Sequence, residues 1–343
     1  MKMKDIQNNK FLTAVAVLVL VSLGSIYYCL FSSISGDGKT HHIYIDNDDN
    51  IDSVYTKLAE VSNGHGMASF KLLAGISSYK NNIRSGCYEI SEDNGALNVF
   101  RKMKNGLQSP IKLVIPSVRT VEKLAATIAK KIMPDSAAIV RALKDQSVCR
   151  KYGYTTETIM CMFIPNTYDI YWNTSVENLL ERMDEESKKF WNEERTHKAE
   201  AMELDKNQVI TLASIVDEET SNDAEKPIIA GMYYNRLKAD MPLQADPTIK
   251  FALKRFELKR IYHNMLQTDS PYNTYKNTGL PPGPIRIPSV KGIDAVLNHV
   301  KHDFIYMCAK EDFSGTHNFA VTYDEHLNNA RKYTEALNKR GVK

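Results

Sequence analysis

The chain has 343 residues, which is enough for two domains and a short additional segment. Apolar types make up 43% and charged types 25%, which excludes a disordered or fibrous chain. The 44 Lys and Arg nearly balance the 41 Asp and Glu, so the net charge of +3 gives no indication of nucleic-acid binding, and the negative mean hydropathy excludes a multi-pass membrane protein.

The first predicted element is a membrane-spanning helix over residues 11–31. This segment contains no charged residue, and roughly twenty apolar residues are what a helix needs to cross a bilayer. Lys residues precede it and Asp37 follows it, so the positive-inside rule places residues 1–10 in the cytosol and the remainder outside. The alternative is a signal peptide cleaved after Ser35, but the apolar core of such a peptide is usually shorter.

A small α+β module is expected after a polar Ser- and Gly-containing spacer over 32–40. Residues 42–46 have the pattern of a strand, and apolar residues over 54–61 recur at helical spacing, with Asp52 as the expected N-cap. Another short strand is expected over 84–90. Nothing here indicates catalysis, so the module suits binding or spacing.

The segment 111–199 is expected to contain a further strand–helix unit followed by helices. The strand and helix lie over 112–129, with Ser117 or Thr120 as the cap. The charged, helix-rich remainder is interrupted by an aromatic, Pro-containing segment over 162–168. This interruption fits the lining of a groove and a plain helix connection equally well.

The strongest chemical signal lies in a helix that follows Asp205, which forms a capping box with Gln208. Apolar residues fall on one stripe of this helix, and Asp217, Glu218 and Glu219 come at its end. At roughly 100° per residue, Glu219 projects among aliphatic side chains, Glu218 faces water and Asp217 lies at the margin. An apolar wall raises the pKa of a carboxyl group, as a general acid near neutral pH requires. The alternative is that all three acids form a solvated helix end.

The sequence beyond this helix is rich in amides, hydroxyls and aromatic rings. A helix is expected over 227–237, another begins near 243–248, and a long loop with Pro and Gly covers 270–285. Amide side chains recognise hydroxyl groups through paired donors and acceptors, and Tyr rings offer flat apolar faces. This combination suits a sugar. Two strands joined around Gly315 and a final helix complete the chain.

Other chemistries have weaker support. Ser77 and Lys80 match the Ser-x-x-Lys pattern of penicillin-binding enzymes, but its companion motifs are absent. The His residues at 41–42 and those at 299 and 302 lack acidic or Cys partners at metal-ligand spacing, so we expect no metal and no cofactor. The five cysteines are expected to be small buried residues, although one bridging pair remains open.

Several motifs follow one another along the chain: ASIVDEET at 213–220, NRL at 235–237, LQADPT at 243–248, YNTY at 272–275, TGLPPGPI at 278–285 and HNF at 317–319. Together they resemble the endolytic murein transglycosylase family of YceG-like proteins. The resemblance is dense from about Gln208 to His326 and thinner before it.

The resemblance implies an α+β chain anchored in the cell inner membrane by one N-terminal transmembrane helix. The N-terminus is then cytosolic, and the catalytic domain is periplasmic or otherwise extracytoplasmic. The implied parts are a cytosolic tail (1–10), the anchor (11–31), a LysM-like membrane-proximal module (32–110), a connecting strand–helix unit and helical region (111–199) and a YceG-like catalytic domain (200–343).

The implied activity is that of a lyase, an endolytic lytic transglycosylase. Such an enzyme cleaves nascent peptidoglycan between N-acetylmuramic acid (MurNAc) and N-acetylglucosamine (GlcNAc), leaves a 1,6-anhydro-MurNAc end and terminates strand elongation. The implied partners are peptidoglycan glycan strands, the inner membrane and peptidoglycan synthases, and not nucleic acid. The family's essential glutamate falls on Glu219, which the helical wheel selects independently.

One carboxyl group can suffice for this reaction, because the nucleophile is a hydroxyl of the same sugar. The candidates for gripping the glycan are Gln244, Asp246, Tyr272, Asn273, Thr278 and His317, each of which could instead stiffen the loop. Asp246 could also be a second carboxylate, although its position before Pro247 favours an N-cap. Two alternatives remain open: a muramidase-type hydrolase using Glu219 with Asp246, and a non-catalytic peptidoglycan-binding scaffold.

Overall fold

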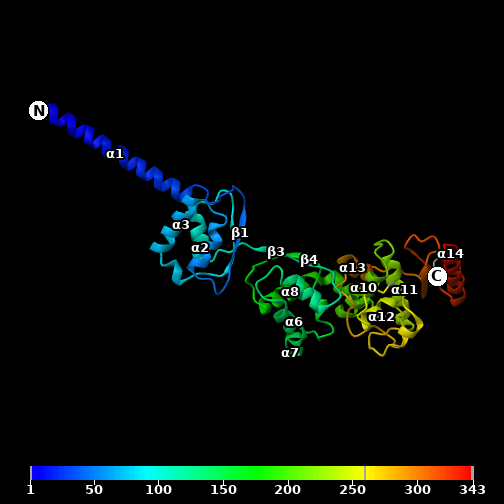
Figure 1. Cartoon of the computed structure of the whole chain (residues 1–343). Helices are drawn as coiled ribbons and strands as arrows, with labels where there is room; N and C mark the ends of the chain where they lie inside the picture. Colours follow the sequence, from blue (N-terminus) through cyan, green and yellow to red (C-terminus); the bar gives the residue numbers. More distant parts are fainter. Residues whose placement is uncertain (1, 259, 341–343) are drawn as a thin grey trace. The chain divides into compact units, whose positions relative to one another are not determined.

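The computed structural model (Figure 1) describes residues 2–258 and 260–340, with side chains described from Lys10 onward. The chain divides into two compact units. Unit 1 runs to Leu113 and includes Lys131–Met133 and Asp169–Thr174, and unit 2 holds Val114–Lys130, Pro134–Tyr168 and the chain from Ser175 on. Within the described residues the structure is mostly helical with three two-stranded sheets, which confirms the mixed α+β class.

Unit 1 contains a βααβ arrangement in which β1 and β2 form an antiparallel pair, from His41 opposite Ile90 to Ile45 opposite Gly86. Helices α2, α3 and α4 supply most of the apolar residues that fill its core, and the two strands supply others. The elements of this unit are α1 (Lys2–Phe31), β1 (His41–Ile45), α2 (Ile51–Ala59), α3 (Gly64–Ile76), the short 3-10 helix η1 (Tyr79–Asn81), β2 (Gly86–Ile90) and α4 (Ala96–Asn105).

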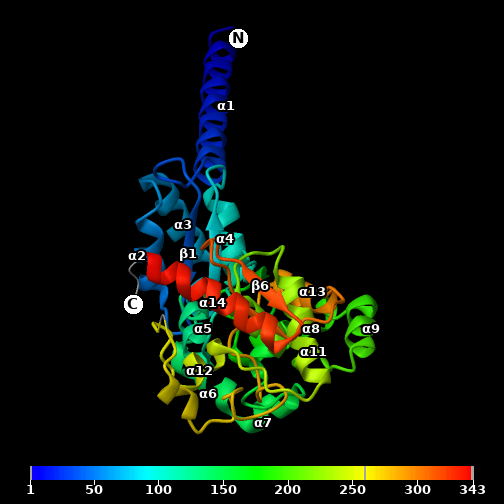
Figure 2. The same cartoon turned by 90° about the vertical axis from the view of Figure 1, so that its right-hand side faces the viewer.

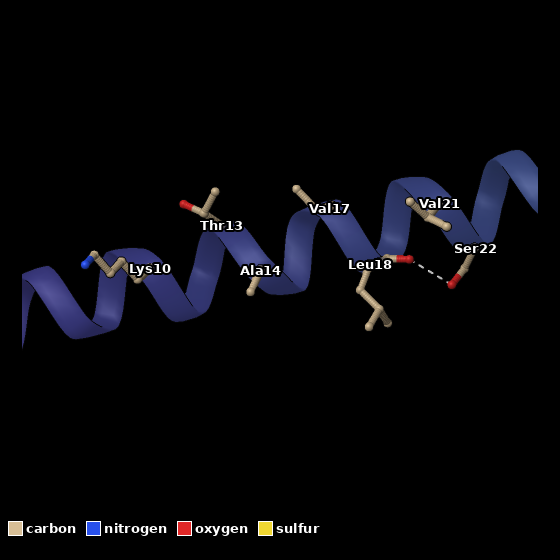
Figure 3. A pocket seen from close by; sticks show the side chains of 7 residues that line it. All are labelled: Lys10, Thr13, Ala14, Val17, Leu18, Val21 and Ser22. Carbon is tan, nitrogen blue, oxygen red and sulfur yellow. Dashed lines mark hydrogen bonds between the residues drawn. The ribbon is translucent and has the colours of Figure 1, made fainter.

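Helix α1 contains the expected membrane-length segment. From Lys10 to Phe31, 22 residues are long and apolar enough to cross a bilayer, and no residue of their most apolar 18-residue window is buried. Within this segment, side chains are half-buried only near its end, at Cys29 and Leu30. Figure 3 shows part of this helix, where apolar side chains project outward and the Ser22 hydroxyl donates to the Leu18 carbonyl at 2.8 Å. The hydroxyl is therefore satisfied within the helix, as a lipid environment requires.

The expected polar spacer after α1 is wrong, because this segment belongs to the core of unit 1. The side chain of Ile34 is 0% exposed among the core residues. Its backbone neighbours form isolated β-bridges, Ser33 with Gly95 and Ser35 with Ser62. One apolar side chain between two hydroxyl residues packs into the core, in a segment that composition alone described as a polar spacer.

The predicted N-cap of α2 is also wrong. The helix begins at Ile51, and the Asn50 side chain accepts hydrogen bonds from the backbone N–H groups of Asp52 and Ser53. The helix starts earlier than the apolar spacing indicated, because Ile51 adds to the face that packs against the core.

Strands β3 (Ile111–Ile115) and β4 (Asn166–Ile170) pair with each other. The expected helix after β3 is α5, and Thr120 is its cap, since its side chain accepts from the Lys123 N–H. The aromatic segment at 162–168 lies at the end of the 3-10 helix η2 and in β4, with Met162 and Phe163 buried. It therefore serves packing at this position.

Unit 2 is built around α10 (Lys206–Glu219), whose residues from Val209 to Val216 are all buried. Figure 1 shows α10 among α11, α12 and α13, and Figure 2 shows α14, in red, beside β6. The other elements are α5 (Val121–Ile128), α6 (Ser136–Lys144), α7 (Gln146–Lys151), η2 (Ile159–Met162), α8 (Val176–Phe190), α9 (Glu193–Ala201), α11 (Lys226–Lys238), α12 (Asp246–Ala252), η3 (His263–Gln267), α13 (Val290–Leu297), β5 (Tyr306–Ala309), β6 (His317–Ala320) and α14 (Tyr323–Lys339).

The predicted capping box of α10 is confirmed, since the Asp205 and Gln208 side chains each satisfy a backbone N–H of the other residue. The prediction of a single apolar stripe on α10 is wrong, because the helix is buried on all sides over two turns. The buried hydroxyl of Ser214 is satisfied in this setting, because it donates to the Thr211 carbonyl at 2.6 Å and accepts from the Ile285 N–H at 3.0 Å.

All five cysteines are free. Three of them, Cys87, Cys149 and Cys161, are buried as expected, whereas Cys29 and Cys308 are only half-buried.

Candidate active site

The cavity that contains Glu219 has a volume of about 370 Å³. Its wall combines carboxyl groups, amides, imidazoles and tyrosine rings, and it is formed entirely by elements of unit 2. The lining residues come from the end of α10, from α11, from the segment leading into α12, from the loop before α13, from β5 and β6, and from the start of α14: Glu219, Met232, Tyr233, Arg236, Leu243, Gln244, Asp246, Tyr275, Tyr306, Met307, Cys308, Ala309, His317, Tyr323 and His326.

Glu219 is the last residue of α10 and is half-buried, as the helical wheel predicts. The Tyr233 hydroxyl donates to its Oε1 at 2.6 Å. Burial raises the pKa of the Glu219 carboxyl to about 7, and the nearby Asp246 and Glu218 add to this effect, whereas the Tyr233 hydrogen bond and Lys250 oppose it. At neutral pH the group therefore exists in both protonated and ionised forms, and Tyr233 fixes one of its two oxygens.

The end of α10 is held by a buried ion pair. The Asp217 carboxylate lies 2.9 Å from the ammonium group of Lys226, and both side chains are almost fully buried. Asp217 also accepts from the Ser289 backbone N–H at 2.5 Å, at the N-terminus of α13. Three helices therefore meet at Asp217, two residues before Glu219.

The prediction that Glu218 faces water is wrong. Arg119 forms a bidentate pair with its carboxylate at 2.7 and 2.9 Å, and Arg286 contacts it at 3.1 Å. The helical wheel does not predict these contacts, because both arginines come from segments distant in sequence, before α5 and before α13. Glu218 therefore serves the packing of α10.

Gln244 lies on the cavity wall in a left-handed backbone conformation, with φ of +53°. Its backbone N–H donates to the Thr274 carbonyl at 2.9 Å, and its side-chain oxygen accepts from Arg236 at 3.2 Å. The Arg236 guanidinium also donates to the carbonyls of Leu243 and Ile305, each at 2.7 Å. This buried arginine therefore holds Gln244 and the two backbone segments beside it.

Asp246 is exposed and lines the same cavity as Glu219. Its interpretation as an N-cap is wrong: it is the first residue of α12, Ala245 is the cap residue, and no side chain caps this helix. The Asp246 carboxylate instead accepts from the Tyr275 hydroxyl at 2.6 Å. The burial of Tyr275, together with its bond to Asp246, raises the pKa of the phenol, which therefore remains a donor.

His317 is the first residue of β6 and lines the cavity. Its Nδ1 lies 3.1 Å from Oε2 of Glu225, and its backbone N–H donates to Oε1 of the same carboxylate at 2.7 Å. The side chain of Glu225 is buried at the start of α11 and does not line the cavity.

The other three predicted binding residues lie outside this cavity wall. Asn273 is 0% exposed, and its amide donates to the carbonyls of Leu266 and Thr268 at 2.9 and 2.7 Å. The Tyr272 ring packs against Phe251, with ring centroids 4.7 Å apart. Thr278 is exposed on the loop. Asn273 and Tyr272 thus shape the loop that carries Tyr275.

Sequence reasoning missed four residues that organise the cavity: Tyr233, Arg236, Tyr275 and Glu225. Each is a charged or phenolic side chain whose role depends on a contact with a residue distant in sequence. The one available signal is polarity in an apolar context, since Tyr233 and Arg236 lie in the mostly buried helix α11. That signal indicates a buried polar group and does not name its partner.

The arrangement suits proton transfer to a ligand rich in hydroxyl groups. Glu219 supplies a proton near neutral pH, while Gln244, Asp246 and His317 offer hydrogen-bonding groups around it. The tyrosine rings 306 and 323 add flat apolar faces.

Comparison with known proteins gives consistent matches. The model of the YceG-like family matches residues 43–332. A protein named endolytic murein transglycosylase from Bacillus subtilis (strain 168) is 37% identical over 173 residues, which are 49% of this chain and 46% of that protein. The endolytic murein transglycosylase of Streptococcus pneumoniae serotype 2 (strain D39 / NCTC 7466) is 26% identical over 294 residues, 75% of this chain and 52% of that protein. The chain thus spans about half the length of the curated relatives it matches.

A crystal structure of a protein described as yceG-like, from Listeria monocytogenes, is similar in fold. It has a TM-score of 0.54 and 26% sequence identity, and the match covers 84% of this chain and 98% of that one.

Proposed function

The chain belongs to the YceG-like family, and we propose that it is an endolytic lytic transglycosylase of peptidoglycan, a lyase that cleaves nascent glycan strands between MurNAc and GlcNAc and so terminates their elongation. Two of its relatives are named endolytic murein transglycosylases. The observation that carries the proposal is the half-buried carboxyl group of Glu219, with a pKa of about 7, in the wall of a polar cavity.

In the proposed mechanism, protonated Glu219 donates to the glycosidic oxygen as the bond to C1 of MurNAc breaks. The resulting carboxylate takes the proton from the C6 hydroxyl of the same sugar while that oxygen bonds to C1. The product ends in 1,6-anhydro-MurNAc, and no water is consumed. Because the nucleophile is already attached to the reacting sugar, the step is intramolecular, and a second catalytic carboxylate is unnecessary.

Tyr233 assigns the two oxygens of Glu219 different tasks. Its hydroxyl donates to Oε1 at 2.6 Å, so Oε2 is the oxygen left to carry the transferred proton. The Tyr233 ring is almost completely buried in α11, which holds this hydrogen bond in one geometry. A fixed donor of this kind limits the reorganisation needed as Glu219 changes charge.

We propose direct glycan contact for Gln244, Asp246 and His317, since these predicted binding residues share the cavity with Glu219. Asn273, Tyr272 and Thr278 would act through the loop, which carries Tyr275. The Thr274 hydroxyl supports that loop, since it accepts from the Ala245 N–H at 3.0 Å.

A muramidase-type hydrolase is the second candidate, and one observation favours it: Asp246 lines the same cavity as Glu219. A hydrolase would use that carboxylate to activate water or to form a covalent intermediate. The Tyr275 hydroxyl holds one oxygen of the Asp246 carboxylate and, among the described residues, leaves the other free, as Tyr233 does for Glu219, so the reaction product is what separates the two candidates.

We further propose that residues 1–10 are a cytosolic tail, 11–31 the anchor, 32–110 a LysM-like module, 111–199 a connecting region and 200–343 the catalytic domain. The βααβ order of β1, α2, α3 and β2 supports the LysM-like assignment. In this proposal the protein crosses the inner membrane once, the catalytic domain faces peptidoglycan outside the cytosol, and peptidoglycan synthases are its protein partners.

Mass spectrometry of digested, uncrosslinked glycan tests the reaction. The full-length protein should release fragments that end in 1,6-anhydro-MurNAc, and Glu219→Gln should release none while keeping the same circular dichroism spectrum. Fragments with a reducing end would support the hydrolase. An unchanged rate in the Glu219→Gln protein would remove the catalytic role of this residue.

A further inference from the structure

Glu225 and His317 are joined by two hydrogen bonds at the edge of the cavity, and together these constrain His317 more than one hydrogen bond would. One carboxylate holds both the backbone N–H and the ring Nδ1 of the same residue, at 2.7 and 3.1 Å. Glu225 is only 5% exposed, and it occupies the N-cap position of α11, where the helix dipole favours a negative charge. Both the position of His317 and the rotation of its ring are therefore fixed.

The contact with Glu225 also determines which ring nitrogen is left for a ligand. Nδ1 points to Glu225, which does not line the cavity, whereas His317 does. Nε2 has no hydrogen-bond partner within the described residues, so it is the ring nitrogen left for a ligand in the cavity. As a carboxylate, Glu225 can only accept hydrogen bonds, so Nδ1 must carry a proton. In the neutral imidazole Nε2 then has none and is an acceptor.

We propose that Glu225 is a positioning residue that holds His317 in the Nδ1–H tautomer, so that Nε2 accepts a hydrogen bond from a hydroxyl or amide N–H of the bound glycan. This inference rests on the proposed function, because it names the group that one wall of that site recognises. It extends the site to a residue that does not itself touch the ligand.

An acceptor at this position complements the rest of the wall. The hydroxyls of Tyr233 and Tyr275 already donate to carboxyl groups of the protein, at 2.6 Å each. Arg236 donates to backbone carbonyls and to Gln244. A sugar presents many hydroxyl donors, and a bare ring nitrogen satisfies one of them without a charge.

Glu225→Gln should reverse this tautomer. The backbone N–H of His317 would still require the Gln oxygen, so the Gln NH₂ group would face Nδ1 and donate to it. The proton would then lie on Nε2, and the cavity would meet a donor in place of an acceptor. The ¹⁵N spectrum of the full-length protein, labelled at histidine and assigned with His317→Asn, should show Nδ1–H in the parent and Nε2–H in Glu225→Gln. Nε2–H in the parent, or the same tautomer in both, would overturn the proposal.

Kinetics test the role in recognition. Glu225→Gln should raise KM for glycan about ten-fold with little change in kcat, which corresponds to one hydrogen bond. Glu311→Gln is the matched control, since Glu311 accepts from Asn318, the next residue of β6, and lies outside the cavity wall. Its KM should stay unchanged. An equal KM in the parent and in Glu225→Gln would refute the inference while leaving the transglycosylase proposal intact.

A second variant covers the case in which Glu225→Gln does not fold. His317→Asn keeps an N–H donor for Glu225 but removes Nε2, so KM should again rise about ten-fold, and an unchanged KM would contradict the proposal. If the parent releases no fragment at all, the proposed function fails, and the ¹⁵N spectrum still decides the tautomer.

Discussion

At neutral pH, where Glu219 would act as an acid in the proposed reaction, its carboxyl group lowers the free energy of unfolding. Its pKa is about 7 in the folded protein against an ordinary value of 4.5, so the folded state binds a proton more tightly than the unfolded chain. The stability that this group contributes is fully present below about pH 4.5 and is lost as the pH rises through about 7. A carboxyl group held in this way opposes folding under neutral conditions.

Glu219→Gln should therefore stabilise the protein at pH 8. A pKa difference of this size corresponds to about 3 kcal/mol, and the half-burial of the side chain should make the measured gain smaller. Urea unfolding of both proteins at pH 8 and at pH 4.5 measures it, and the gain should vanish at the lower pH. An equal difference at both values would show that the carboxyl group does not titrate as stated.

Tyr233→Phe should move the alkaline limb of the pH–rate profile to higher pH. The hydroxyl donates to Glu219 and lowers its pKa, so removing the donor lets burial raise that pKa further. In the proposed mechanism the protonated form of Glu219 starts the reaction, so activity should then persist to higher pH, although kcat should fall with the loss of positioning.

Tyr234→Phe is the control for this experiment. Tyr234 is the next residue of α11, and its hydroxyl donates to the Met202 carbonyl at 3.1 Å, outside the cavity. Its pH profile should match that of the parent. Coincident profiles for all three proteins would exclude Tyr233 from any influence on Glu219.

At the scale of elements, the joint between α10, α11 and α13 determines where Glu219 lies. Asp217→Ala removes the buried one of the two carboxylates that contact Lys226, and it also removes an acceptor for the Ser289 N–H. Breaking a buried pair from one side typically costs about 3–5 kcal/mol, so thermal unfolding should occur at a clearly lower temperature.

Asp223→Asn is the comparison, because Asp223 also contacts Lys226 but is about half exposed. It should change the midpoint far less, and equal losses would mean that burial of the Asp217 pair is not what stabilises the joint.

The elements themselves were largely readable from the sequence. The strands expected over 42–46 and 84–90 are observed at His41–Ile45 and Gly86–Ile90. Like the capping box of α10 and the start of α11 near Pro227, they follow from local chemistry. Glu219 was found because the spacing of apolar residues along its own helix was enough to predict its partial burial.

What the sequence could not supply is the set of contacts between elements. The sequence predicts that Glu218 faces water, but Arg119 and Arg286 contact its carboxylate. It predicts that Asp246 is an N-cap, but the Asp246 carboxylate accepts a hydrogen bond from Tyr275. In each case a side chain distant in the sequence determines the role. Helical periodicity predicts which face of a helix is apolar. It does not predict that neighbouring elements bury the other faces as well.

At the scale of the whole molecule, the buried side chain of Ile34 argues for an uncleaved N-terminal helix. Cleavage after Ser35 would remove Ile34 from the core of unit 1, together with the bridge between Ser33 and Gly95. The full-length protein should therefore remain in the membrane fraction after alkaline carbonate washing, with its N-terminal tail still attached. A mature N-terminus near Gly36 would contradict this.

Two truncations provide the matched comparison. A protein that begins at Ser32 loses the anchor and keeps Ile34, whereas one that begins at Asp37 loses both. Removing a buried Ile side chain costs about 2–5 kcal/mol, so the shorter protein should unfold at lower urea concentration. Equal stability of the two would mean that Ile34 does not belong to the core.

Only two residues separate the last residue of α1 from Ile34. A tether that short gives the βααβ module almost no freedom to diffuse away from the lipid surface. In the proposed topology, the module would contact a growing glycan strand only in a thin layer next to the membrane, where the strand is synthesised. Mature cell wall farther from the membrane would lie beyond the module's reach. Inserting a flexible stretch between Phe31 and Ser32 would deepen that layer, and the average length of the released glycan should then change with the length of the insert.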